Sequence, residues 1–397
     1  MSRFSLSALS GQTGRFFFIN AFGAMVFCFF SPLIPTFMVE ELGVEPMYIG
    51  LFMVATAISG VLYSQLVGRL SDNGVNDKLL YQISMLGSLL FAVSLMVLDG
   101  FWQLLIAGVV LLSIARTSMS QSMTMIRKYA ERSKLNTTTL NAQMRSSISG
   151  VWIIGPPIAF GLAGAFGFRA SFLAAAVLAV VVMLVAHYNL PETTSNKKTK
   201  QQREDSEPIP MLFWLLGAIT FFAFAAHSIY FTAIPLYLVQ EMGAEVSVSG
   251  LLLGLTAGLE IPFMLLAARY CARLGVSRLL RWSFVSGFIF YASLQWVESV
   301  PSIFMLTIFN GIFFGVFAGL SISLFQDALP DRPGVASAFY SNSMTIASMA
   351  GGSIAGLLAQ WVDFKFALLG SVVSIVLAFI GLIIYEAIQA KSVEGEG

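Results

Sequence analysis

The chain has 397 residues, of which 57% are hydrophobic and only 11% are charged. Soluble domains carry about 25% charged residues, so this chain cannot cover a water-facing surface, which excludes soluble enzymes and secreted modules. The 22 basic and 21 acidic residues nearly balance, which argues against a nucleic-acid partner. Cys28 lies in an apolar run and Cys271 in a basic one, so no disulfide framework is expected. The composition predicts a polytopic membrane protein.

Twelve apolar runs follow one another along the chain, each about long enough to cross a bilayer. They cover residues 16–39, 47–68, 79–98, 101–126, 138–165, 169–190, 211–239, 247–268, 279–297, 301–326, 334–361 and 365–386. The runs are continuous, whereas a transmembrane barrel would show short alternating segments. The first run is too long for a signal peptide and has no cleavage site after it. We therefore expect an all-α membrane protein with twelve transmembrane helices.

The basic residues are distributed unevenly over the connections between these runs. Of the 22 Lys and Arg residues, 18 lie in the termini and the even-numbered connections, and only Arg169 and Lys365 lie in odd-numbered ones. The other two, Arg116 and Arg145, lie inside runs. Because basic residues are retained on the cytoplasmic side, both termini are predicted to be cytoplasmic.

The chain contains an internal repeat. Residues 34–57 match residues 234–257 at ten of 24 positions without a gap, and a second stretch pairs Gly155 with Gly351 and Phe168 with Phe364. The polar segment 191–210 is expected to be a flexible cytoplasmic linker. It separates a predicted N-terminal six-helix bundle, residues 1–190, from a C-terminal bundle with a short tail, residues 211–397. Two parallel six-helix repeats are typical of the major facilitator fold, in which the halves rock around a site at mid-membrane.

Three charged residues lie far from the ends of their runs: Arg116, Arg145 and Glu260. Each is nine to eleven residues from the nearest cytoplasmic base, which places it roughly 13–17 Å below the inner surface. Intramembrane ions are costly and are functional candidates by default. The repeat aligns Glu260 with Gly60 and Arg145 with Ser341, so the charges are specific to one half.

Our hypothesis is that Glu260 carries a coupling proton and that Arg145 or Arg116 is its alternating partner. A buried glutamate takes up a proton when its cationic partner moves away and releases it when the partner returns. A permanent ion pair that joins helices and a direct hydrogen bond from Glu260 to substrate are the two alternatives.

Polar and aromatic residues inside the runs are candidates for substrate binding. Asn141, Arg145 and Trp152 lie on one face of the fifth helix. The full set is Asn20, Gln121, Asn141, Trp152, His227, Tyr230, Asn310 and Asn342. Amides and aromatic rings suit a neutral polyhydroxylated ligand better than an ion. For each amide the alternative is a hydrogen bond between helices.

Gly311, Gly315 and Gly319 recur at every fourth residue of the tenth helix, which predicts close helix packing. With only His187 and His227 in the chain, a His-rich metal centre is excluded. We find no nucleophile–base pair and no phosphate loop, so we expect neither catalysis nor a cofactor.

Several motifs resemble those of a known group of transporters. Residues 68–74 resemble the Gly/Asp loop signature of the major facilitator superfamily, with Asn73 where a base usually follows Asp72. Arg116 has the spacing from Leu112 of the arginine motif in the fourth helix, which is associated with proton coupling in antiporters. Residues 150–164 resemble the antiporter motif of the fifth helix, which implies export.

More specific segments resemble the bacterial sugar efflux transporter family of this superfamily. They are residues 126–131, 144–145, 152–157, 257–262 and 325–327. The resemblance spans the chain from the first helix to the twelfth and implies a secondary active exporter of sugars or small glycosides, driven by protons, in a bacterial inner membrane. Asp72 and Asp327 would then belong to a cytoplasmic gate.

The expected partners are thus a sugar, protons and the lipid bilayer, and we expect a monomer. A proton-coupled multidrug exporter and a membrane sensor of sugars that does not transport are the alternatives. The sequence does not identify the sugar.

Overall fold

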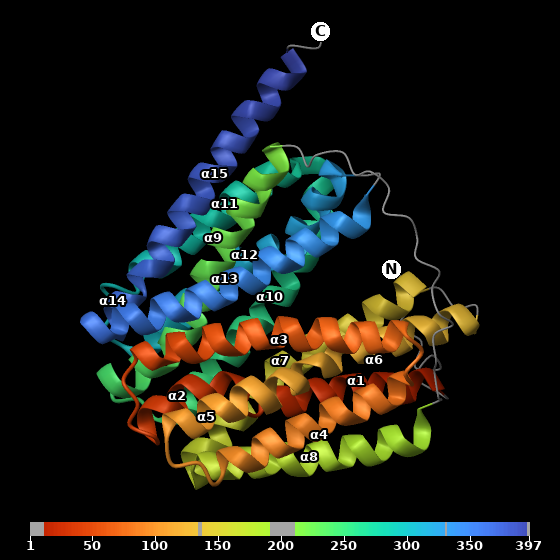
Figure 1. The fold of residues 1–397 in the computed structure, drawn as a ribbon. Coiled ribbons are helices and arrows are strands. Elements are labelled where there is room, and N and C mark those ends of the chain that lie inside the picture. The colour runs from red at the N-terminus through yellow and green to blue at the C-terminus, as the bar shows by residue number, and fades with distance from the viewer. Residues whose placement is uncertain (1–11, 134–136, 191–210, 330–331, 395–397) are drawn as a thin grey trace. The chain divides into compact units, whose positions relative to one another are not determined.

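A computed structural model of the chain describes residues 12–133, 137–190, 211–329 and 332–394. Within these ranges the regular secondary structure is helical and no strand is present (Figure 1). The predicted linker 191–210 lies outside the described residues. The chain divides into two compact units: unit 1 comprises Met1–Val44 and Ala55–Arg203, and unit 2 comprises Glu45–Val54 and Glu204–Gly397.

The described part of the first repeat contains ten helical segments, of which η2 is a 3₁₀ turn and η3 is π-helical. They are α1 (Gln12–Cys28), η2 (Ser31–Leu33), α2 (Ile34–Glu40), α3 (Met47–Asp72), α4 (Asp77–Leu95), α5 (Phe101–Ala107), η3 (Gly108–Leu112), α6 (Ser113–Arg132), α7 (Thr137–Phe166) and α8 (Phe168–Asn189). The break between α1 and α2 includes Pro32, whose ring cannot donate a backbone hydrogen bond.

The second repeat, over its described residues, contains eight helical segments, of which η4 is π-helical. They are α9 (Met211–Leu236), η4 (Tyr237–Glu241), α10 (Val246–Leu274), α11 (Val276–Ser293), α12 (Val300–Ala328), α13 (Pro333–Trp361), α14 (Phe364–Ala367) and α15 (Leu369–Glu394). All twelve predicted runs are therefore helical. Ten helices of the described chain are long and apolar enough to cross a membrane, and the other two runs form α11 and α13.

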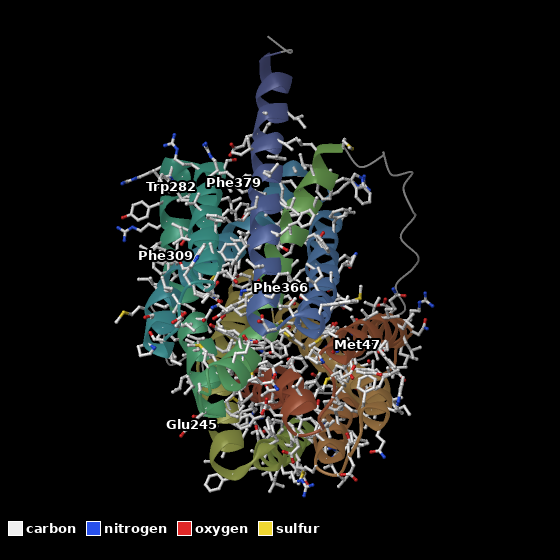
Figure 2. All side chains as sticks on the ribbon, turned by 90° about the vertical axis from the view of Figure 1, so that its left-hand side faces the viewer. Met47, Glu245, Trp282, Phe309, Phe366 and Phe379 are labelled. Carbon is white, nitrogen blue, oxygen red and sulfur yellow. The ribbon has the colours of Figure 1, made fainter. Side chains whose placement is uncertain are left out.

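The membrane-facing surface is visible in the side chains that the helices leave uncovered. Large apolar residues are exposed along the helices, for example Leu62 at 62%, Leu265 at 63% and Met305 at 77%. Tryptophans such as Trp282 and Trp296 are exposed near helix ends (Figure 2 labels Trp282). Apolar side chains in this number would be unfavourable in water and fit a lipid surface bordered by aromatic residues.

The two repeats share much of their internal packing, although the described residues of α3 and α6 in unit 1 lack the extensive contact that α10 makes with α12 in unit 2. In unit 1, α4 packs on α6 and α8, and α1 packs on α7 and α8. In unit 2 the equivalent helix α11 packs on α12 and α15, and α9 packs on α13 and α15. Even the turns match, because Gly43 and Gly243 have φ of 60° and 64°, a conformation that glycine adopts without strain. The internal repeat predicted from the sequence is confirmed by this packing.

The glycines of α12 allow it to pack very closely on α10. A Cβ added at Gly311 would lie 2.5 Å from the Cβ of Leu259, and one at Gly315 would lie 2.4 Å from the carbonyl oxygen of Glu260. At Gly319 the added atom would lie 2.7 Å from Cγ of Met264. The predicted packing role of these glycines is confirmed.

Helix α3 begins in unit 2 and continues into unit 1. Its first residues pack on α13, where Ser353 Oγ donates to the carbonyl of Gly50 at 3.3 Å. A Cβ added at Gly352 would lie 2.9 Å from Cγ and 3.4 Å from Cβ of Met53. Glycine therefore permits the close contact between these two helices.

Candidate functional site

Unit 2 contains a cluster of polar side chains between its helices, which we call the Glu260 cluster. It comprises Tyr230 of α9, Thr256 and Glu260 of α10, Tyr291 of α11 and Asn310 of α12. Tyr230, Tyr291 and Asn310 are fully buried, and Thr256 is 3% exposed. Sequence reasoning identified three of the five residues and missed Thr256 and Tyr291. The match of Thr56 with Thr256 in the repeat was a usable signal, whereas Tyr291 lies in an otherwise apolar run.

Glu260 is half-buried, and its backbone is held against α12 at Gly315. Its carboxylate lies within electrostatic range of the hydroxyl groups of both Tyr230 and Tyr291. The glycine of α12 brings α10 close to the helix that carries Asn310. A carboxyl group in such a place can exchange a proton or accept hydrogen bonds from a ligand.

The hydrogen-bonding capacity of the Glu260 cluster is only partly used. The Tyr291 hydroxyl donates to Asn310 Oδ1 at 3.3 Å. The Tyr230 hydroxyl lies close to the side chains of Thr256 and Asn310 but forms no hydrogen bond of standard geometry. The amide nitrogen of Asn310 is also buried without a partner. Buried polar groups are normally hydrogen-bonded, so unsatisfied donors gathered in one place indicate a site for a polar ligand.

His227 lies one turn before Tyr230 on α9. Its ring stacks on Phe314 of α12, with ring centroids 3.6 Å apart and planes at 12°. The Nδ1 atom is buried and has no hydrogen-bond partner. His227 thus adds an aromatic pair and one more unsatisfied polar atom on the same two helices as Tyr230 and Asn310.

Unit 1 carries a glycine at the position that matches Glu260, and Arg116 lies beside it. Gly60 of α3 aligns with Glu260 of α10 in the repeat. A Cβ added at Gly60 would lie 3.6 Å from Cδ and 3.8 Å from Nη1 of Arg116. The residue of unit 1 that aligns with Glu260 is therefore a glycine that lies beside an arginine.

The guanidinium group of Arg116 is half-buried and is only weakly satisfied within unit 1. The hydrogen bond that Nη1 donates to the Thr56 carbonyl is 3.4 Å long. Arg145 lies on α7, but its side chain, like that of Asn141, is outside the described part of the structure. The pairing of Glu260 with either arginine stays a prediction.

Asn20 of α1 joins three helices of unit 1. Its amide nitrogen donates to Ser147 Oγ of α7, and its carbonyl oxygen accepts from Ser122 Oγ of α6, both at 3.1 Å. Asn20 therefore forms hydrogen bonds between helices, which was the alternative to a role in substrate binding. Gln121, next to Ser122, is 3% exposed, and its Oε1 has no partner.

The other predicted substrate residues are less enclosed. Trp152 is half-buried on α7, and Asn342 is exposed on α13. Neither belongs to the Glu260 cluster as we define it.

At the end of unit 1 that carries the basic loops, Asp77 holds three helices together, although sequence reasoning had singled out Asp72. Asp77 is fully buried at the start of α4, where it accepts from Ser71 Oγ of α3 and pairs with Lys128 Nζ of α6, both at 2.5 Å. Asp72 is exposed. A carboxylate in the first turn of a helix, six residues after the serine that it binds, was the signal available in the sequence.

Replacing Asp77 with Asn should lower the free energy of unfolding by about 3 kcal/mol, because it leaves Lys128 without its anionic partner in a buried place. Thermal unfolding of the purified protein in detergent measures the effect. Asp72→Asn, five residues earlier, is the matched control and should leave the unfolding temperature unchanged. An equal effect of the two variants would contradict the assignment.

Comparisons with known proteins agree with this architecture. The model of the Major Facilitator Superfamily matches residues 16–219 and again residues 216–395. A solved structure of the nucleoside transporter NupG shares the fold, with a TM-score of 0.78 and 14% identity over 95% of this chain and 99% of that one. Two matches of one family model correspond to the two repeats.

Curated relatives are more similar in sequence. Sugar efflux transporter A of Dickeya chrysanthemi is 33% identical over 83% of this chain and 84% of the relative. Sugar efflux transporter C of Escherichia coli (strain K12) is 32% identical over 83% and 84%. The chain therefore belongs to the sugar efflux transporter family of the Major Facilitator Superfamily.

Proposed function

We propose that the chain is a secondary active exporter of sugars or small glycosides that exchanges its substrate for protons by alternating access. The observation that carries this proposal is the identity of 32–33% to two sugar efflux transporters over 83% of the chain. A bacterial inner membrane and cytoplasmic termini complete the proposal, supported by the basic loops and the bacterial relatives.

The chemistry of the Glu260 cluster supports a sugar as substrate. Tyr230, Tyr291, Asn310 and Glu260 offer hydroxyl, amide and carboxyl groups, which suit the hydroxyl groups of a sugar. The stacked rings of His227 and Phe314 lie on the same two helices and provide flat apolar surface, against which the C–H face of a sugar ring can pack. In this proposal Tyr230 and Asn310 bind substrate directly, and Asn20 positions the helices of unit 1.

The placement of Glu260 and Arg116 supports proton coupling. The repeat aligns Glu260 with Gly60, so the carboxylate is not required by the scaffold, and Gly60 lies beside Arg116. In the proposed cycle Glu260 binds a proton when no cation faces it. The approach of Arg116 or Arg145 favours the carboxylate and releases the proton.

The test of the function is counterflow of labelled glucosides and galactosides in proteoliposomes that contain the purified chain, with and without a pH gradient. We expect exchange of at least one of these sugars, and accumulation when the interior is acidic. Exchange of hydrophobic drugs without sugar would show the multidrug alternative. Binding of sugar without flux would show a sensor, and either outcome would overturn the proposal.

Alternating access can be tested at the contact between α3 and α13. The Cβ–Cβ distance of 3.4 Å between Met53 and a residue at 352 is close to that of a disulfide. If the repeats move apart on that side during transport, oxidation of the variant Met53→Cys, Gly352→Cys should stop sugar exchange, and a reductant should restore it.

The disulfide experiment needs a background in which Cys28 and Cys271, both free thiols, are replaced by Ser. Each single cysteine variant is a control that should be insensitive to oxidant. Undiminished exchange by the fully oxidised double variant would refute movement at this contact.

A further inference from the structure

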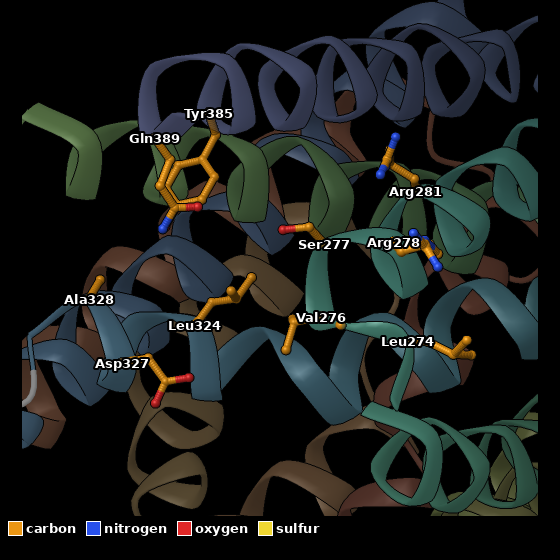
Figure 3. Close-up of a pocket in the computed structure, with 11 residues that line it drawn as sticks. Leu274, Val276, Ser277, Arg278, Arg281, Leu324, Asp327, Ala328, Tyr385 and Gln389 are labelled. Carbon is orange, nitrogen blue, oxygen red and sulfur yellow. The ribbon is translucent and has the colours of Figure 1, made fainter. Parts of the chain in front are cut away.

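A cavity lies in unit 2, away from the Glu260 cluster. It has a volume of about 430 Å³ and lies where α10 ends, α11 begins, α12 ends and the last turns of α15 pass (Figure 3). Its polar wall consists of Ser277, Arg278, Arg281, Asp327, Tyr385 and Gln389. None of these residues belongs to the proposed sugar site, so the cavity needs an explanation of its own.

Positive charge dominates the segment that forms one side of this cavity. Residues 269–281 contain four arginines, Arg269, Arg273, Arg278 and Arg281, and no acidic residue. Of these four, Arg278 and Arg281 line the cavity, whereas Arg269 and Arg273 add positive charge to the preceding segment. Arg281 pairs with Glu386 through Nε at 3.4 Å, and Asp327 lies on the opposite wall. Figure 3 shows the two arginines of the wall on α11, and Asp327 with Tyr385 on the side of α12 and α15.

The beginning of α11 adds to the attraction for an anion. Gly275 precedes the helix with a φ of 80°, and no side chain caps the first turn. Ser277 offers a hydroxyl group beside Arg278 on the same wall. Arginine, hydroxyl and first-turn amide groups are together the usual donors to phosphate oxygens.

The surroundings of the cavity are those of a membrane surface. Tyr270 is 40% exposed, Leu274 42% and Trp282 68%, with Trp282 projecting from α11 in Figure 2. The guanidinium of Arg269 lies 6.0 Å from the centre of the Tyr270 ring. Aromatic residues beside a basic pocket at helix ends are typical of places where phospholipid head groups bind.

We propose that this cavity binds a phosphate ester, with the phosphate held by Ser277, Arg278 and Arg281. The alcohol portion of the ester lies toward Tyr385, Gln389 and Asp327, whose oxygen and amide groups pair with hydroxyl groups. The head group of an anionic phospholipid and a soluble phosphate ester share this chemistry, and the exposed aromatic and apolar rim favours the lipid.

Native mass spectrometry of the full chain in detergent tests the site, with dihexanoyl phosphatidylglycerol, dihexanoyl phosphatidylcholine and glycerol 3-phosphate as probes. We expect phosphatidylglycerol to bind and Arg278→Gln to weaken it about tenfold, the loss of one charge-assisted contact. Arg69→Gln, an exposed arginine of unit 1, is the control and should have no effect.

Asp327→Asn should change the affinity in the opposite direction, because it removes the carboxylate from the cavity wall. Misfolding of the variant would weaken phosphatidylglycerol binding, so tighter binding by Asp327→Asn can only come from the removed charge. Binding of phosphatidylglycerol alone identifies a lipid site, and binding of glycerol 3-phosphate as well identifies a general phosphate site. Absence of binding by both, or binding that Arg278→Gln leaves unchanged, would overturn the proposal.

Discussion

Replacing Glu260 with Gln is expected to abolish accumulation of sugar by a pH gradient while sugar exchange continues. The amide has the size and hydrogen-bonding groups of the carboxyl but cannot carry a proton across the cycle. It can still accept a hydrogen bond beside Tyr230 and Tyr291, on whose hydroxyl groups Glu260 acts. The measurement compares gradient-driven uptake with counterflow in the same proteoliposomes.

The control for this experiment is Glu245→Gln, an exposed glutamate just before α10 that should leave both activities unchanged. If Glu260→Gln instead lost exchange and accumulation together, Glu260 would bind the sugar directly. If it accumulated sugar as the wild type does, Glu260 would be no more than a structural residue.

Replacing Gly60 with Glu is expected to remove proton coupling even though Glu260 is unchanged. Gly60 lies against Arg116, and the 3.6–3.8 Å separations between a Cβ at position 60 and the arginine leave ordinary space for a side chain. The introduced carboxylate would pair permanently with Arg116 inside unit 1 and make the arginine unavailable to Glu260. Accumulation driven by the gradient should therefore fall to the level of Glu260→Gln.

The matched control is Gly60→Gln, which adds the same bulk without the charge. It should retain a much larger part of the coupled transport than Gly60→Glu does. Equal activity of these two variants would show that Arg116 is not the partner of Glu260, and Arg145 would then be the remaining candidate.

Much of the fold could be predicted from the sequence because a bilayer imposes simple rules on length and composition. Each of the twelve apolar runs became a helix, since backbone groups in hydrocarbon must be satisfied within the segment. The glycine stripe on α12 was interpreted correctly for the same kind of reason. Glycine at every fourth position of a transmembrane helix is typical of close packing against another helix.

The candidate site could be predicted only in part. Tyr230, Asn310 and Glu260 were predicted because polar residues are rare in apolar runs. Tyr291 was missed because tyrosine is common in such runs. The burial of Asp77 depends on where α6 places Lys128, 51 residues away in the chain. Similarly, the sequence showed Arg116 and the Gly60–Glu260 match, but not that Arg116 lies against Gly60.

The alignment of Gly60 with Glu260 makes the contact between Gly60 and Arg116 informative. In unit 2, glycines bring α12 onto α10, with Gly315 against the backbone of Glu260. In unit 1 the residue that aligns with Glu260 is Gly60 of α3, which lies beside Arg116 of α6. The two repeats thus differ at this position, and the difference fits the proposed roles of Glu260 and Arg116 in proton coupling.

The most direct test of the central claim, that Glu260 carries the coupling proton, is to measure protons released when sugar binds. Purified wild-type and Glu260→Gln proteins are mixed with a transported sugar in weakly buffered detergent solution that contains a pH indicator. The wild type should release protons on binding, and the variant should bind sugar without releasing any. Equal proton release by both proteins would contradict the account.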